Sequence, residues 1–143
     1  HKKIEIGPSD YTNPHEAASF VLATGVDRLA IAIGNIHGIN LDEPRLDFDR
    51  LAEIRKLVPK SVALVLHAGS GIDDQDIKKA IEQGISNVHI STELRVLFRK
   101  ELEENLRAHP NEYALYRLEK DIVDNVSNLV RQKIRLFGSQ SRV

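Results

Sequence analysis

The 143-residue chain is 41% apolar and 29% charged, a composition typical of a single globular domain. Its net charge of −1 provides no basic field for nucleic acid or anionic membranes, and no apolar run approaches the roughly 20 residues that span a bilayer. The absence of cysteine excludes disulfides and thiolate metal ligands, and without a visible secretory leader we expect a cytoplasmic location.

Helical and extended patterns alternate along the chain. Asn13-Pro14 combines a helix N-cap with proline at the first helical position, and Gly25 is placed to end that helix. Nearly continuous apolar runs at 29–33 and 62–66 are typical of parallel strands buried on both faces. The expected elements, in chain order, are a helix at 14–24, a strand at 29–33, a helix at 47–58, a strand at 62–66, a helix at 73–83, a strand at 85–90, a helix at 91–109 and a helix at 111–136.

Single helices separate the three expected strands, so the strands should be parallel with right-handed crossovers. Three such strands would leave apolar edges that more chain or another subunit has to cover. A (β/α)₈ barrel needs about 200 to 250 residues or more. We therefore predict an α/β fold in which residues 1–143 form the C-terminal part of one TIM (β/α)₈ barrel, with about three βα units and a helical extension over about 110–143.

Histidines follow the first two apolar runs. His37 and His67 should lie at the carboxyl ends of neighbouring strands, where barrels and open α/β sheets keep their active sites. Neutral imidazole binds zinc at about 2.0 to 2.1 Å, and two such groups can share one ion with further ligands from elsewhere. A single histidine at a strand end is more often a hydrogen-bonded structural residue, and only the matched placement of two makes a shared metal site an equal explanation. The pattern therefore leaves a metal site and a structural role open.

Two strand ends also resemble anion sites. Gly69-Ser70-Gly71 precedes one expected helix and Ser91-Thr92 precedes the next. Backbone N–H groups of glycine turns and helix N-termini, with hydroxyls beside them, can bind phosphate. A tight turn and an ordinary helix cap would give the same residues, so both interpretations stay open at this point.

Four motifs in register resemble the class II, zinc-dependent ketose-bisphosphate aldolases, in the branch of tagatose- and fructose-bisphosphate aldolases. The end of the chain is also similar, and the resemblance runs from about Tyr11 to Val143. The motifs are Gly34-x-x-His37-Gly38, 46–51 (LDFDRL), 66–71 (LHAGSG) and 88–94 (VHISTEL).

The resemblance implies reversible aldol cleavage of a ketose 1,6-bisphosphate, of fructose or tagatose, to dihydroxyacetone phosphate and glyceraldehyde 3-phosphate. Zn²⁺ would polarise the ketone as a Lewis acid, with His37 and His67 as two of three zinc-binding histidines. A monovalent cation, Na⁺ or K⁺, would bind near the same backbone. The residues implied to bind substrate phosphate are Gly38, Gly69, Ser70, Ser91, Thr92 and, for the far phosphate, Arg117.

Two residues depart from the family pattern. The family usually has glycine where Ala68 stands, and a methyl group there would restrict close backbone approach. It usually has asparagine, which contacts the enediolate intermediate, where His89 stands. His89 is therefore a possible catalytic group, and we expect it to alter substrate preference or to impair activity.

The family's remaining zinc histidine and its general acid–base aspartate belong to the first half of the barrel. With no methionine in the sequence, we interpret the chain as a fragment that is inactive alone and is partnered by the N-terminal half of the same barrel. The complete protein should be a homodimer or homotetramer, with no nucleic-acid or membrane partner. The alternatives are a noncatalytic half-barrel subunit that binds a phosphorylated sugar or assembles with a partner, and a zinc-free sugar-phosphate barrel.

Overall fold

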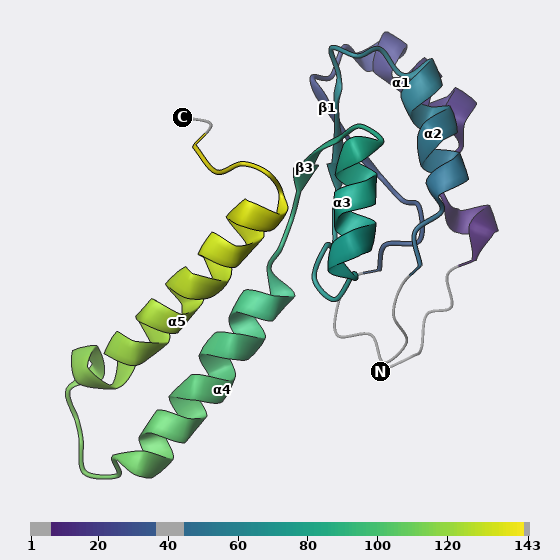
Figure 1. Cartoon of the computed structure of the whole chain (residues 1–143). Coiled ribbons are helices and arrows are strands. Elements are labelled where there is room, and N and C mark those ends of the chain that lie inside the picture. Colours follow the sequence, from purple (N-terminus) through teal and green to yellow (C-terminus); the bar gives the residue numbers. More distant parts are fainter. Residues whose placement is uncertain (1–6, 37–44, 142–143) are drawn as a thin grey trace. The chain divides into compact units, whose positions relative to one another are not determined.

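The computed structural model describes residues 7–36 and 45–141, which form two compact units that divide between Ile90 and Ser91. The first unit begins with a short 3₁₀ helix, η1, and then alternates helices and strands (Figure 1). Its elements are η1 (Pro8–Asp10), α1 (Pro14–Thr24), β1 (Arg28–Ile31), α2 (Phe48–Leu57), β2 (Ala63–Leu66), α3 (Asp74–Glu82) and β3 (Ile85–Val88). This order confirms the predicted βα series.

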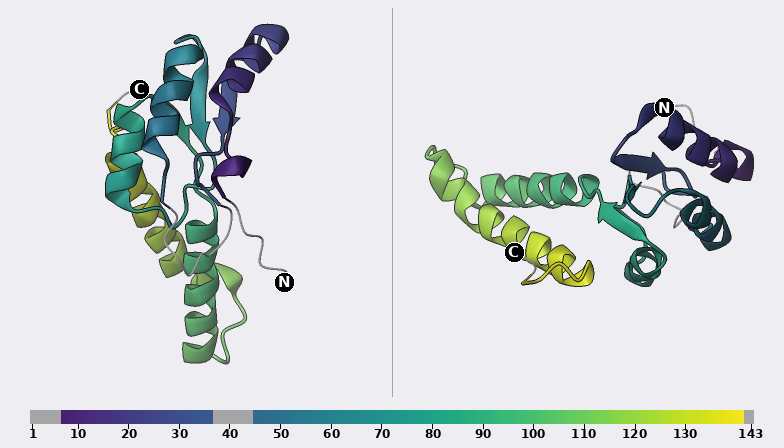
Figure 2. Two further views of the ribbon diagram at one scale, coloured as in Figure 1. Left: turned by 90° about the vertical axis from the view of Figure 1, so that its right-hand side faces the viewer. Right: turned by 90° about the horizontal axis from the view of Figure 1, so that it is seen from above.

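The three strands form one parallel sheet in the order β1-β2-β3. Ile31 pairs with Leu66, and Leu66 pairs with Val88, so the carboxyl ends of all three strands meet at one edge. Helices α1, α2 and α3 lie on the same side of the sheet, as the view from above shows (Figure 2). This arrangement places the residues that follow each strand next to one another.

The core of this unit lies between the sheet and its helices. Residues 64–66 of β2 are buried, and α2 and α3 each contribute residues with no solvent exposure, including Leu51, Ile54 and Ile77. The first strand is less buried than expected, because Ala30 is exposed, and Ser86 in β3 is exposed as well. The expectation of burial on both faces therefore holds for the central strand, because β1 and β3 form the edges of this sheet.

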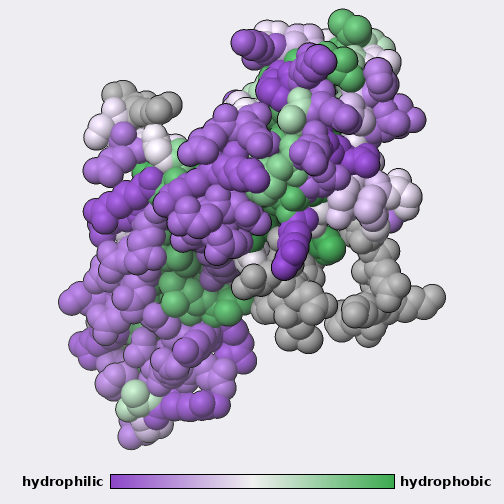
Figure 3. All heavy atoms as spheres, turned by 45° about the vertical axis from the view of Figure 1, so that its right-hand side comes forward, coloured by the Kyte–Doolittle hydropathy of each residue, from purple (hydrophilic) through white to green (hydrophobic). Residues whose placement is uncertain are grey.

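The second unit is an antiparallel helical hairpin of α4 (Thr92–Ala108) and α5 (Leu115–Leu136). Lys133 Nζ lies 2.9 Å from Glu93 Oε2, and Asn105 Nδ2 donates to the Leu118 carbonyl at 3.0 Å, so opposite ends of the helices are joined. Helix α5 begins four positions later than the sequence indicates, and its first residue, Leu115, is 65% exposed. Hydrophilic side chains cover most of the face visible in Figure 3. Among the described helices, none is both long and apolar enough to cross a membrane.

Candidate active site

The histidines that follow β2 and β3 lie side by side at the carboxyl edge of the sheet. The ring centroids of His67 and His89 are 4.8 Å apart, and the planes meet edge to face at 73°. Both side chains are exposed. The sequence placed His67 at a strand end, and the structure adds that the histidine of the next strand reaches the same point.

Backbone pairing between β2 and β3 continues past the strand ends. The His89 N–H donates to the Leu66 carbonyl at 3.0 Å, and the Gly69 N–H donates to the His89 carbonyl at 2.9 Å. A Cβ at Gly69 would lie 2.8 Å from Val88 Cγ1 and 3.2 Å from the His89 oxygen. Only glycine therefore allows the turn after β2 to pack this closely against β3.

Ala68 adopts the left-handed conformation that glycine favours, with φ of 56° and its side chain buried. A non-glycine residue in this region carries a cost of roughly 1–2 kcal/mol. The departure from the family's usual glycine thus keeps the backbone conformation and adds a methyl group to the packed interior.

The turn that contains Gly69 and Ser70 leads directly into α3. Ser70 is 7% exposed, and Asp73 caps the helix by accepting the Gln75 N–H at 2.8 Å. Gly69 and Ser70, both predicted to bind phosphate, therefore lie at the same edge of the sheet as His67.

Asn35 at this edge is a residue that the sequence analysis did not single out. Its Oδ1 accepts the Ile33 N–H at 2.8 Å, and its Nδ2 donates to the carbonyls of Ile31 at 3.2 Å and His67 at 2.9 Å. Asparagine after a strand usually indicates a turn, so no signal in the sequence pointed to a bond across to β2.

The predicted zinc ligands are only partly placed. His67 offers an exposed imidazole at a strand end, which suits one position in a zinc site that takes nitrogen and oxygen donors. His37 and Gly38 lie outside the described residues. Within residues 7–36 and 45–141, no group of three His, Asp or Glu side chains could hold a metal, so a site at His67 needs ligands from elsewhere.

The hydroxyl of Ser91, the N-cap residue of α4, does not cap that helix. Arg95 Nε and Nη2 donate to Ser91 Oγ at 3.1 and 2.8 Å instead. The Ser91 hydroxyl therefore does not serve as an acceptor for the N–H groups in the first turn of α4. Such an arrangement is compatible with the predicted binding of an anion by Ser91 and Thr92.

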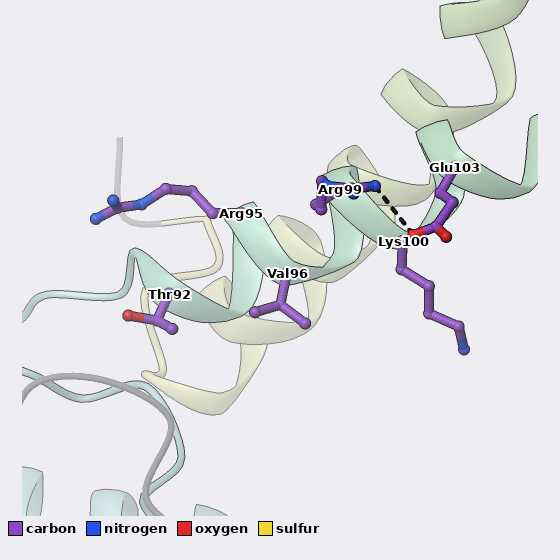
Figure 4. A pocket seen from close by; sticks show the side chains of 6 residues that line it. All are labelled: Thr92, Arg95, Val96, Arg99, Lys100 and Glu103. Atoms are coloured by element: carbon purple, nitrogen blue, oxygen red, sulfur yellow. Dashed lines mark hydrogen bonds and ion pairs between the residues drawn. The ribbon is translucent and has the colours of Figure 1, made fainter. Parts of the chain in front are cut away.

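A groove of about 450 Å³ runs along the same helix and is lined by α4 alone (Figure 4). Arg99 in its lining pairs with Glu103 at 3.0 Å, which offsets one of the positive charges along the groove. Its lining residues are Thr92, Arg95, Val96, Arg99, Lys100 and Glu103.

Arg117, predicted to meet the far phosphate, lies in the first turn of α5 and is exposed. Its Nη1 contacts Glu112 Oε2 at 3.1 Å. The backbone N–H of Ala114, together with Arg117 and the N–H of Tyr113, holds the pKa of Glu112 below its usual value. Glu112 thus binds the N–H groups of the two residues that precede α5 and also engages the arginine.

Comparison with known proteins decides the family. Residues 2–142 match the sequence profile described as fructose-bisphosphate aldolase class-II. The chain belongs to this family.

Two relatives and one solved structure agree with this class II aldolase assignment. Sulfofructosephosphate aldolase from Alkalicoccus urumqiensis and YdjI from Escherichia coli K12 are each 42% identical over 92% of this chain and 45% of their own length. The crystal structure of the YdjI aldolase is similar with a TM-score of 0.79 at 40% identity, covering 94% of this chain and 48% of that one.

A fructose-bisphosphate aldolase from Campylobacter jejuni shares the fold, with a TM-score of 0.74 at 19% identity over 96% of this chain and 49% of that one. The chain thus spans about half the length of these aldolases. The prediction of a partial TIM barrel is confirmed.

Replacing Ala68 by glycine should leave the free energy of unfolding of the aldolase within about 0.5 kcal/mol of its parent value. Relief of roughly 1–2 kcal/mol of left-handed strain is offset by loss of a buried methyl group, about 0.8 kcal/mol, and by greater unfolded-state entropy. The control is A80G in α3, where the fully buried alanine relieves no such strain and the loss should be about 1.5–2 kcal/mol. Urea unfolding measures both, and equal losses would contradict strain at Ala68.

The S91A variant should lose less than about 0.5 kcal/mol of unfolding free energy, because the Ser91 hydroxyl does not cap α4. N13A is the matched control, since Asn13 Oδ1 accepts the N–H groups of His15 and Glu16, and its loss should be about 1 kcal/mol. Calorimetric titration with inorganic phosphate should show weaker binding to S91A and unchanged binding to N13A. A stability loss in S91A equal to that in N13A would show that the hydroxyl caps the helix.

Proposed function

We propose that the complete protein is a zinc-dependent aldolase that cleaves a ketose 1,6-bisphosphate, of fructose or tagatose, into dihydroxyacetone phosphate and glyceraldehyde 3-phosphate. The observation that carries this proposal is that His67, His89 and the Gly69-Ser70 turn lie together at the carboxyl end of the parallel sheet, in a chain of the aldolase family. The reaction needs a metal-ligating group and a phosphate-binding turn within one substrate length of each other, and His67 and the Gly69-Ser70 turn would fill these two roles.

The residues have separate roles in the proposal. His67 would hold zinc together with His37, and zinc would supply Lewis-acid polarisation of a substrate carbonyl. Gly69 and Ser70 would bind one phosphate through the turn after β2. The first N–H groups of α4, with Ser91 and Thr92, and the backbone at Gly38 would provide further donors.

Other groups of the proposed enzyme lie beyond this edge. The general acid–base aspartate would come from the N-terminal half of the barrel, so this chain alone would be inactive. A Na⁺ or K⁺ ion would bind near the backbone of the two zinc histidines, and Arg117 would meet the far phosphate after releasing Glu112.

We expect a cytoplasmic homodimer or homotetramer. The hairpin supports such an assembly, since Tyr113, Leu115 and Tyr116 expose 87%, 65% and 72% of their surface. A partner surface could cover these three residues at once.

Chelation tests the reaction and its metal. The purified complete protein should cleave at least one of fructose 1,6-bisphosphate, tagatose 1,6-bisphosphate and sulfofructose phosphate, lose that activity with a chelator, and regain it with added zinc. The third substrate is included because one 42% identical relative is named for it. Turnover that survives complete metal removal would contradict the mechanism, and phosphate binding without cleavage of any ketose would favour the noncatalytic subunit.

The H67Q variant should bind zinc more than about 100-fold more weakly than the parent protein, because a direct ligand is removed. H15Q is the matched control, since His15 is an exposed histidine on α1 in the same unit. Zinc affinity is measured by competition with a chromophoric chelator. Equal affinities of H67Q and the parent protein would remove His67 from the zinc site.

His89 would contact the reacting part of the substrate, where the family usually has asparagine. H89N should change the ratio of kcat/KM between two ketose phosphates by tenfold or more, equivalent to about 1.4 kcal/mol. Because the side chain is exposed, the unfolding free energy should stay within about 0.5 kcal/mol. H109N, at the exposed end of α4, is the control; an identical rate change for every substrate would contradict a role in substrate preference.

A further inference from the structure

We propose that Asn35 is a positioning residue that fixes the backbone of the zinc ligand His67 through a side-chain bridge between β1 and β2. The inference rests on the proposed function, because it assigns Asn35 a role toward the proposed metal site. Asn35 itself touches neither the imidazole ring of His67 nor a reacting atom in this assignment; it acts through the main chain.

The need for a bridge comes from the way in which β1 ends. The β1–β2 pairing stops at Ile31 and Leu66. The residue that follows β1, Ala32, pairs with Thr12 instead: its N–H donates to Thr12 Oγ1 at 2.8 Å, and its carbonyl accepts the Thr12 N–H at 2.8 Å. The segment after β1 therefore does not continue the backbone hydrogen bonds of the parallel sheet beside His67.

The carboxamide of Asn35 spans the resulting gap. Its Nδ2 bonds the last carbonyl of β1, at Ile31, and the carbonyl of His67, while its Oδ1 accepts the Ile33 N–H. Two carbonyls can only accept hydrogen bonds, so the nitrogen has to face them and the oxygen has to face the N–H. Asparagine satisfies all three groups, whereas aspartate would direct a negative charge at two carbonyl oxygens.

The backbone on the C-terminal side of His67 is therefore held by both neighbouring segments of the sheet. Asn35 bonds the His67 carbonyl, the next residue, Ala68, is buried in a left-handed conformation, and Gly69 is bonded to the carbonyl of His89. The Cα–Cβ bond of His67 therefore has a set direction. A ligand held in place loses less conformational entropy when the metal binds, and functional groups have to be held to within about 0.5 Å.

Matched substitutions on the two sides of the β1 end test this role. N35A and N35D remove the bridge to His67, whereas T12V removes the bond to Ala32 on the other side of the same segment and leaves His67 untouched. For each variant of the complete protein we would measure zinc affinity by chelator competition, the visible spectrum of the Co²⁺ form, and the unfolding free energy of the metal-free protein.

All three variants should lose stability, but only the Asn35 variants should bind zinc about 10- to 100-fold more weakly and show an altered Co²⁺ spectrum. N35D should have the larger effect. Unchanged zinc affinity in N35A and N35D, or an equal loss in T12V, would overturn the positioning role. A parent protein that binds no zinc would instead overturn the proposed function, so the two failures are distinguishable.

Discussion

The parallel pairing of β2 with both neighbouring strands is the constraint on which the candidate site depends. It brings three carboxyl ends to one edge, and the chain has to leave the sheet there three times. Each exit is bonded differently: β1 turns to Thr12, β2 enters the left-handed Ala68, and β3 stays bonded to Gly69 through His89. The side chains of the candidate site belong to the residues that directly follow these strands.

Helix ends could be predicted from the sequence because local bonds determine them. Asn13 caps α1 through N–H groups two and three residues later, and Gly25 ends the helix with φ of 67°, as the sequence indicated. The same logic holds for Asp73 at the start of α3. The position of His67 and of the Gly69-Ser70 turn at the carboxyl end of the sheet could also be predicted, because the topology of a parallel sheet alone determines it.

Features that depend on hydrogen bonds between residues far apart in the sequence could not be predicted. The first strand was expected to reach Ile33 but ends at Ile31, because Ala32 bonds to a residue 20 positions earlier. The reach of Asn35 to His67, 32 positions away, belongs to the same class, because nothing in the local sequence distinguishes it from an ordinary turn residue.

The two departures from the family pattern differ in what they alter. At Ala68 the backbone keeps the conformation that glycine would adopt, so the change is confined to one buried methyl group. At His89 the backbone bonds to Leu66 and Gly69 involve only main-chain atoms, which any non-proline residue provides. The frame of the site is therefore independent of the side chain at position 89. The side chain at position 89 is exposed, stands beside His67 and makes no hydrogen bond to this frame, so it can be exchanged at little cost in folding free energy.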